Sequence, residues 1–333
     1  MAEAAFTVGF AGPLVTVQDA GRPGHMRFGV PASGPMDRLA FDAANAALGN
    51  DSGQTAIEIS LGGLILQCTQ GPVTVAIAGG DFTVQLGSQK TRSWTVLTVQ
   101  KGERLSITAG QAGSWAYLAV AGRIMAPAWL GGQATHSTSG FGGGALQTGQ
   151  TITLFDASVR EDRLGDIHQP DFQASGPIRV VTGPQDQHFA PETVARFLSD
   201  SFTVSDAYDR MGMRLKGPEL PLTGALSIPS EPIVRGSVQV SGDGVPTVLL
   251  ADHQTTGGYP KIATVISPDI DRLAQYRAGQ SLRCVAITSA QAVAEARSHA
   301  LSKADYLAEV SVARGTLAQR LMRENLNHGC VFD

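Results

Sequence analysis

Glycine and proline constrain this chain more than any other residue types, with 39 Gly and 17 Pro spread through its 333 residues. They divide the sequence into short segments, as in all-β proteins. Between them lie short apolar or β-branched runs with turn residues on both sides, which indicate strands. We expect strands at 63–68, 72–79, 93–99, 104–108, 114–122, 151–155, 177–183, 201–205, 237–241, 247–252, 262–267 and 282–288. This density of strands predicts a mainly β fold built from barrels or sandwiches.

Helices are expected at only a few places, each with its own boundary signals. The stretch 36–49 puts apolar residues on one face, with an aspartate in the first turn and a glycine at the end. A second helix opens at Pro191, and a third has Ser267 as its N-cap, with a proline at the first helical position. From Ala290 to about residue 327, the helical spacing predicts a C-terminal appendage of one or two helices.

The domain organisation follows from a change in composition near the middle of the chain. The segment 158–176 is polar, charged and free of periodicity, so we place the domain boundary there. We expect an N-terminal β-domain at 1–160, a C-terminal β-domain at 177–289 and a helical extension at 290–333. Within the first domain, residues 131–150 are rich in Gly and Ser and predict a long loop, and such loops are usually functional or mobile.

Charge and cysteine usage exclude several classes of function. The formal net charge is -4, from 25 basic and 29 acidic residues that are well mixed, so nucleic acid is not an expected partner. No apolar run approaches the roughly 20 residues that a membrane-spanning helix needs, so we expect no membrane contact and a cytoplasmic location. The three cysteines lack CxxC spacing, and the seven histidines show no ligand spacing, so no metal site is predicted. No glycine-rich loop has the spacing of a nucleotide-binding motif.

The N-terminal stretch 18–37 is the first candidate site. It has no apolar period, yet it offers acidic, amide, guanidinium, imidazole and hydroxyl groups among glycines and prolines, and it ends at a helix N-terminus. Free amides there, with Ser33 and Arg22 nearby, could hold a carboxylate or a carbonyl oxygen. The alternative is a scaffold in which Asp37 caps the helix, Ser33 lies in a turn and Arg22 pairs with Asp19.

The decapeptide DHQTTGGYPK at 252–261 is the second candidate site. It connects two apolar strands, and it is longer than a hairpin needs, because two residues suffice to reverse the chain. The residues 255–258 could present successive backbone N–H groups to an oxyanion, and Lys261 could bring a point charge to a carboxylate or phosphate. Asp252 and His253 could handle protons. The alternative is a surface turn whose lysine is solvated.

These stretches together resemble the biotin-dependent carboxyltransferase family, also called the allophanate hydrolase subunit 2 family. The family contains the carboxyltransferase domain of urea carboxylase, the Kip antagonist proteins and the C subunit of the bacterial ATP-dependent 5-oxoprolinase. The resemblance runs from about residue 16 to residue 288 and is carried by VQDAGRPG, GVPASGPMDRLAFDAANAALGN, DRMGMRLKGP and LADHQTTGGYPKIATVISPDIDRLAQ. It implies two domains of cyclophilin-like β-barrel topology with an active-site cleft between them.

The resemblance, together with the loop chemistry described above, implies a set of site residues from both halves of the chain. Catalytic roles are expected for Asp19, Asp252 and Lys261. Substrate binding is expected of Gln18, Arg22, Ser33, Asp37, Glu58, Arg210, Gln239, Gln254, Thr255, Thr256, Gly257, Gly258 and Tyr259.

Three functions remain open at this point. The first is the C subunit of an ATP-dependent 5-oxoprolinase, acting on the lactam or amide carbonyl of a small acid, with a Kip inhibitor-like protein and a LamB/YcsF-like protein as partner subunits. The second is a biotin-dependent carboxyltransferase component acting on urea or a similar amide. The third is a non-catalytic regulator that binds a Kip-type kinase-inhibitor protein. We expect no cofactor bound by this chain itself, since ATP or biotin would be supplied through partner subunits.

Overall fold

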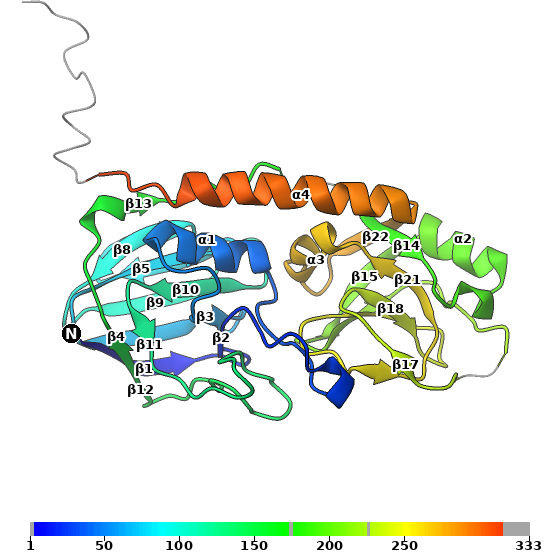
Figure 1. The fold of residues 1–333 in the computed structure, drawn as a ribbon, viewed down its shortest axis with the longest axis horizontal. Helices are drawn as coiled ribbons and strands as arrows, with labels where there is room; N and C mark the ends of the chain where they lie inside the picture. Colours follow the sequence, from blue (N-terminus) through cyan, green and yellow to red (C-terminus); the bar gives the residue numbers. More distant parts are fainter. Residues whose placement is uncertain (1–2, 173–175, 225–226, 316–333) are drawn as a thin grey trace, which may run out of the picture.

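The computed structural model describes residues 3–172, 176–224 and 227–315, and it confirms a mainly β fold (Figure 1). Strands up to residue 166 form two sheets, whereas most strands from residue 178 onward form a closed barrel. Each predicted strand has a counterpart at nearly the predicted position. None of the helices in the described ranges is long and apolar enough to cross a membrane.

The first half consists of two sheets that enclose an apolar core. The seven-stranded sheet has the order β11 (Arg123–Ile124), β12 (Thr151–Phe155), β1 (Ala4–Ala11), β4 (Leu64–Gln70), β9 (Arg104–Ala109), β6 (Phe82–Leu86) and β7 (Gln89–Arg92). The six-stranded sheet has the order β13 (Gly165–Asp166), β8 (Thr95–Val99), β5 (Val73–Ala78), β10 (Ala116–Val120), β3 (Ala56–Ile59) and β2 (Thr16–Gln18). Every residue of β5 and β10 is buried, because helix α1 (Arg38–Leu48) covers the outer face of this sheet.

The second half is a barrel of seven strands. Their order is β14 (Ile178–Thr182), β21 (Lys261–Val265), β18 (Ser237–Val240), β19 (Pro246–Leu249), β16 (Gly212–Lys216), β15 (Ser201–Tyr208) and β22 (Ser281–Ala286). A parallel pairing of β14 with β22 closes it, while the other pairs are antiparallel. A separate two-stranded sheet joins β17 (Glu231–Pro232) to β20 (Thr256–Gly257).

The helix boundaries follow ordinary capping chemistry. Helix α1 begins after Asp37, whose carboxylate accepts the Ala40 N–H at 2.9 Å, and it ends at Gly49 in the left-handed conformation. Helix α2 (Pro191–Ser199) begins at the predicted proline. Helix α3 (Ser267–Ala274) corrects one prediction: its N-cap is Ile266, and Ser267 is already inside the helix. Short 3-10 turns occur at Met26–Phe28, Glu161–Arg163 and Asp186–His188.

Helix α4 (Ser289–Val310) lies across both halves of the molecule (Figure 1). It packs against α1 of the first half and against α3 and β14 of the second. An ion pair joins Lys303 to Asp42 of α1 at 2.6 Å, and another joins Glu295 to Arg179 of β14 at 2.8 Å. The helix therefore bridges the two halves. The part of the expected C-terminal extension beyond residue 315 lies outside the described residues.

The segment between the two halves is packed rather than free. Arg160 Nη1 donates to the Leu48 carbonyl at 3.0 Å, and Arg163 Nη1 donates to the Ala47 carbonyl at 3.3 Å. Both arginines thus lie at the C-terminus of α1, where a cation is electrostatically favourable. Arg163 Nη1 also donates to the Ser311 carbonyl at 2.8 Å, just after α4.

Candidate functional site

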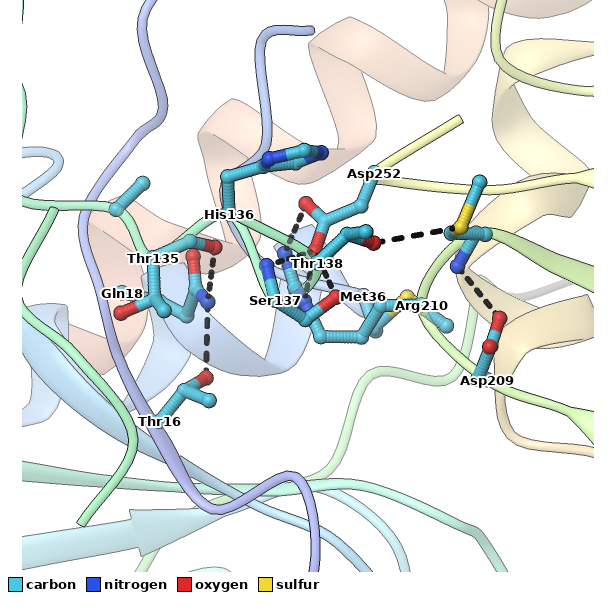
Figure 2. A network of polar contacts seen from close by, with 12 residues as sticks. Thr16, Gln18, Met36, Thr135, His136, Ser137, Thr138, Asp209, Arg210 and Asp252 are labelled. Atoms are coloured by element: carbon cyan, nitrogen blue, oxygen red, sulfur yellow. Dashed lines mark hydrogen bonds and ion pairs between the residues drawn. The ribbon is translucent and has the colours of Figure 1, made fainter. Parts of the chain in front are cut away.

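A completely buried arginine joins the two halves of the molecule. Arg210 follows β15, and its side chain is 0% exposed. Its Nε and Nη2 donate to the two oxygens of Asp252, each at 2.9 Å, and Nη2 also donates to the Gly34 carbonyl at 2.8 Å. Its Nη1 donates to Glu58 on β3. Figure 2 shows Arg210 and Asp252 at the centre of this network.

The Glu58 carboxylate extends the network into the first half. Its second oxygen accepts the Met36 N–H and the Tyr117 hydroxyl, both at 2.8 Å. The Tyr117 oxygen in turn accepts the Asp37 N–H at 2.8 Å. Burial and then the charge of Glu58 raise the pKa of Tyr117 well above its usual value, so the phenol stays protonated and donates. The network therefore fixes the turn that leads into α1.

Asp252 is held as an anion. Besides Arg210, its Oδ2 accepts the Ser137 N–H at 2.9 Å and the Ser137 hydroxyl at 2.8 Å, so the Gly- and Ser-rich loop of the first half docks on it. Burial alone would raise the pKa of Asp252, but the charge and hydrogen bonds of Arg210 and Ser137 outweigh burial and lower it to about 2. These contacts favour a role in positioning Arg210 and the loop over the proton-handling role that the sequence suggested.

Asp19 is likewise occupied by backbone donors. Its carboxylate accepts the N–H groups of Gly21 at 2.9 Å, Ala134 at 3.1 Å and Gln133 at 2.5 Å. Among the ion pairs of the described residues, none joins Asp19 to Arg22, so the pairing considered from the sequence is not the one formed. Asp19 instead ties the N-terminal stretch to the long loop. The same residue lines a cavity of about 620 Å³ together with Thr55, in the first half.

Four buried polar atoms of the predicted residues have no hydrogen-bond partner among the described residues. They are Gln18 Oε1, Arg22 Nη1, Ser33 Oγ and Lys261 Nζ. The residues themselves are between 0% and 3% exposed. A buried donor or acceptor without a partner is costly, so these four atoms are available to a ligand or to a water molecule. Arg22, Ser33 and Lys261 supply donors that suit carboxylate and carbonyl oxygens. Gln18 supplies an acceptor that suits an N–H group.

Arg22 lies beside the long loop. Its Nε donates to the Trp129 carbonyl at 3.3 Å, Nη2 donates to the Ala134 carbonyl, and the guanidinium stacks over the Trp129 ring at 5.1 Å. Burial lowers the pKa of Arg22, and the nearby charges of Asp19 and Asp252 oppose this shift. Gln18 uses its amide nitrogen on the adjacent Thr135 carbonyl, at 3.1 Å. The loop thus holds both side chains, and each keeps one polar atom without a hydrogen-bond partner among the described residues.

Ser33 combines an unpartnered hydroxyl with backbone strain. Its φ is 55°, a left-handed conformation that is uncommon for a residue other than glycine. The strain accompanies a close crossing of two chain segments, since a Cβ at Gly21 would lie 2.8 Å from the Ala32 carbonyl oxygen. Strained residues of this kind cluster at functional sites.

Asp37 contributes to the junction of the two halves. One of its oxygens caps α1, and the other accepts the Gln275 amide at 2.7 Å, from the end of α3. Asp271 of α3 also accepts the Leu39 N–H at 3.3 Å, so both carboxylates lie at the N-terminus of α1. Burial, and then the charge of Asp271, raises the pKa of Asp37 to about 7. Its contacts make it a helix cap and a junction residue.

The decapeptide is ordered by its own strand pairing. The residues Thr256–Gly257 form β20, which pairs with β17, and the Thr255 carbonyl accepts the Ile233 N–H at 3.0 Å. The backbone amides at 255–258, which were expected to face an oxyanion from a loop, therefore belong in part to a short strand. Gly257 is closely packed, because a Cβ there would lie 2.5 Å from Gln239 Nε2 and would displace the end of that side chain.

Beneath this loop lies a cluster of amide side chains. Gln254 Nε2 donates to Gln239 Oε1 at 3.1 Å, and Gln239 Nε2 donates to the Tyr259 carbonyl at 3.4 Å. All three line a cavity of about 430 Å³, which also includes Met211. Met211 touches the first half, since the Thr138 hydroxyl lies 3.4 Å from its sulfur. This cavity is therefore beside the junction where Arg210 is buried.

The structure thus brings predicted residues from both halves together around Arg210, and it separates others. Glu58 and Asp252 bind Arg210 directly. Lys261 is not among the residues that line either cavity described above, and Asp19 lines the one in the first half. Among the described residues, no group of three or more His, Cys, Asp or Glu side chains is placed to hold a metal ion.

Sequence reasoning did not single out four residues that contact the predicted ones, Tyr117, Ser137, Gln185 and Glu231. Tyr117 is one aromatic residue in an apolar strand, and Ser137 is one of several serines in a glycine-rich loop. Gln185 lies in a polar bend, and Glu231 begins the short exposed strand β17. The composition of these segments gives no signal that would single these residues out.

Comparison with known proteins decides the family. The family described as "Carboxyltransferase domain, subdomain A and B" matches residues 28–286. The chain belongs to this family. It is 34% identical over 280 residues to the 5-oxoprolinase C subunit of Haemophilus influenzae, a match covering 83% of this chain and 89% of that protein. The 5-oxoprolinase C subunit of Escherichia coli is 33% identical over 279 residues, with the same coverage.

A solved structure supports the same family membership. The K. lactis urea amidolyase superposes on this carboxyltransferase-family chain with a TM-score of 0.80 and 25% sequence identity. The superposition covers 92% of this chain and 20% of that chain. The family match ends at residue 286, before α4 begins at Ser289.

Proposed function

We propose that this chain is the C subunit of an ATP-dependent 5-oxoprolinase complex, which opens the lactam of 5-oxoproline to give glutamate. The observation that carries the proposal is the extent of the match, because 89% of each of two proteins named as 5-oxoprolinase C subunits is covered. The urea amidolyases, by contrast, are matched over 17% and 18% of their lengths. The relatives are parts of enzymes, so an enzyme component is the general class.

The polar groups of the chain suit this substrate class. Arg22 Nη1, Ser33 Oγ and Lys261 Nζ are buried donors that could receive the carboxylate or the developing oxyanion of a lactam. Gln18 Oε1 is a buried acceptor that could receive the lactam N–H. We assign Arg210, Glu58 and Asp252 to holding the two halves in register around these groups.

The ATP chemistry is assigned to partner subunits. The glycine-rich loop at 140–144 leads toward strand β12, not into a helix N-terminus, so it does not fit the usual cradle for phosphates. The two proposed partners are a Kip inhibitor-like protein and a LamB/YcsF-like protein. This chain would bind and orient the substrate, and the partners would supply the phosphoryl group.

A second candidate is carboxyl transfer from biotin to urea or a related amide. It is supported by the superposition on the K. lactis urea amidolyase over 92% of this chain. The sequence has no Met-Lys-Met biotinylation motif, so biotin would arrive on a partner.

Reconstitution separates these functions. The chain is combined with the Kip inhibitor-like and LamB/YcsF-like partners, and ATP-dependent release of glutamate from 5-oxoproline is measured. We expect turnover only when all three components are present. Turnover by the two partners alone at the same rate would contradict the proposal. A complex without turnover would favour the non-catalytic regulator, and carboxylation of urea with a biotin carboxylase partner would favour carboxyl transfer.

A further inference from the structure

Lys261 is a buried cation whose hydrogen bonds are incomplete. Its side chain is 3% exposed, and its ammonium nitrogen has no hydrogen-bond partner among the described residues. The nearest carboxylate oxygen is Glu231 Oε2, at 3.8 Å, which is beyond hydrogen-bonding distance. An ammonium carries three donors, and burying them without acceptors is costly. The pair is therefore an electrostatic contact without a hydrogen bond.

The backbone of Lys261 is fixed in place by Gln185. Gln185 Oε1 accepts the Lys261 N–H at 3.0 Å, and the Gln185 N–H donates to the Lys261 carbonyl at 3.2 Å. The pairing of β21 with β18 also changes register next to Lys261, which stands opposite Gln239. Such bulges often redirect side chains at active sites. The position of the Lys261 backbone is therefore set by the fold and does not depend on Glu231.

Glu231 differs from Lys261 in that it faces water. Its side chain is 52% exposed, and the oxygen nearest Lys261 also accepts the Gln185 side-chain amide. A half-exposed carboxylate can turn into solvent at little cost, whereas a buried lysine cannot. Glu231 thus covers the ammonium from the solvent side, and it is the replaceable member of the pair.

The pair is adjacent to the cavity of about 430 Å³. Gln239, the cross-strand neighbour of Lys261, lines that cavity. Directly opposite residues in an antiparallel pair have Cβ atoms about 5 Å apart. The β17–β20 ladder, which carries Glu231, closes over the same glutamine, because a Cβ at Gly257 would touch it. An anion entering beside Gln239 would meet Lys261 next.

We propose that Glu231 is a specificity-determining residue that shields Lys261 and is displaced into solvent when the substrate's carboxylate pairs with the ammonium. The proposal rests on the proposed function, since it names the place of the 5-oxoproline carboxylate. It makes Glu231 a competitor for the same cation. A ligand with the lactam ring but without a carboxylate cannot displace it.

The test compares two ligands in the reconstituted three-component complex. KM is measured for 5-oxoproline, and the inhibition constant is measured for 2-pyrrolidinone, the same ring without a carboxylate. Glu231→Gln should lower the KM for 5-oxoproline about fivefold, the upper end of the range for a partly exposed ion pair, and leave the inhibition constant of 2-pyrrolidinone unchanged. Lys261→Met should raise the KM for 5-oxoproline and also leave 2-pyrrolidinone unchanged.

Glu295→Gln is the matched control. Glu295 is 50% exposed and pairs with Arg179 on β14, so the same substitution there removes a comparable ion pair at a different place. It should change neither constant. An unchanged or raised KM in Glu231→Gln, or an equal change for both ligands, overturns the proposal. A wild-type complex without turnover overturns the function and this proposal together, whereas an active complex lacking the fivefold shift overturns this proposal alone.

Discussion

Arg210→Met should be among the most destabilising single substitutions in this chain. Arg210 is 0% exposed and is the shared partner of Glu58 and Asp252, which are also 0% exposed. Methionine keeps much of the volume but leaves both carboxylates buried without their cation. Removing one partner from a buried ion pair typically costs about 3–5 kcal/mol, because the remaining charge is uncompensated. We take this range as the expected loss in free energy of unfolding.

Dividing the loss in free energy of unfolding by the unfolding entropy gives the expected shift in melting temperature. At about 2.1 cal/mol/K per residue, the 333 residues give about 0.7 kcal/mol/K. The expected shift is therefore about 4–7 °C at pH 7, measured by differential scanning calorimetry. Arg214→Met is the control, because Arg214 is 45% exposed and pairs with the exposed Asp243, which is worth about 0–1 kcal/mol. Equal shifts for the two variants would refute the reasoning.

The same variant has a pH signature. In the wild type, the pKa of Asp252 is lowered to about 2, so its contribution to stability is present above the unfolded pKa of about 3.9. That contribution is lost as the pH falls from about 4 toward 2. Because Arg210→Met has already lost it, the difference in melting temperature between wild type and variant should shrink over this interval. A constant difference would contradict the assignment of the low pKa to Arg210.

Three further predictions concern the junction, the bridging helix and the loop. The pKa of Asp37 is raised to about 7, so the wild type loses stability as the pH rises from about 4 through 7. Asp37→Asn keeps the helix cap but does not titrate, so its melting temperature relative to wild type should rise over that pH range. Melting temperatures that change in parallel with pH would contradict this prediction. Removing all residues after position 287 deletes α4 and its buried Tyr306, so calorimetry should show a melting temperature lower by at least about 3 °C. An unchanged melting temperature would show that α4 does not stabilise the two halves. Gly257→Ala places a Cβ 2.5 Å from the end of the Gln239 side chain and should cost about 1–3 kcal/mol in denaturant unfolding. Gly224→Ala, where a Cβ would meet no atom of the described residues within 4 Å, should cost less than about 1 kcal/mol, and equal costs would count against the close packing.

Much of the fold could be predicted because most strands carry a local signal. Runs such as 72–79 and 114–122 are apolar throughout, since both faces of those strands are buried. The strand at 89–92, QKTR, was missed because it lies at the edge of its sheet and is mostly exposed, so it has no apolar face. The short strand 56–59 was missed because its central glutamate interrupts the apolar pattern, and that glutamate is Glu58.

The two candidate stretches could be picked out from the sequence, but the contacts that their residues make could not be read there. The sequence motif around Arg210 does not show that this arginine is buried or that it contacts Glu58, 152 positions away. The acids Asp19 and Asp252 were expected to be catalytic, yet backbone amides surround the first and a buried guanidinium binds the second. Such roles depend on long-range contacts, which local composition does not encode.

A crystal structure of the chain with 5-oxoproline bound tests the central claim most directly. We expect the ligand to contact at least two of the four buried atoms that lack partners among the described residues, Arg22 Nη1, Ser33 Oγ, Gln18 Oε1 and Lys261 Nζ, with its carboxylate on a cation. Ligand bound only in the cavity of about 620 Å³ beside Thr55, away from these atoms, would contradict it.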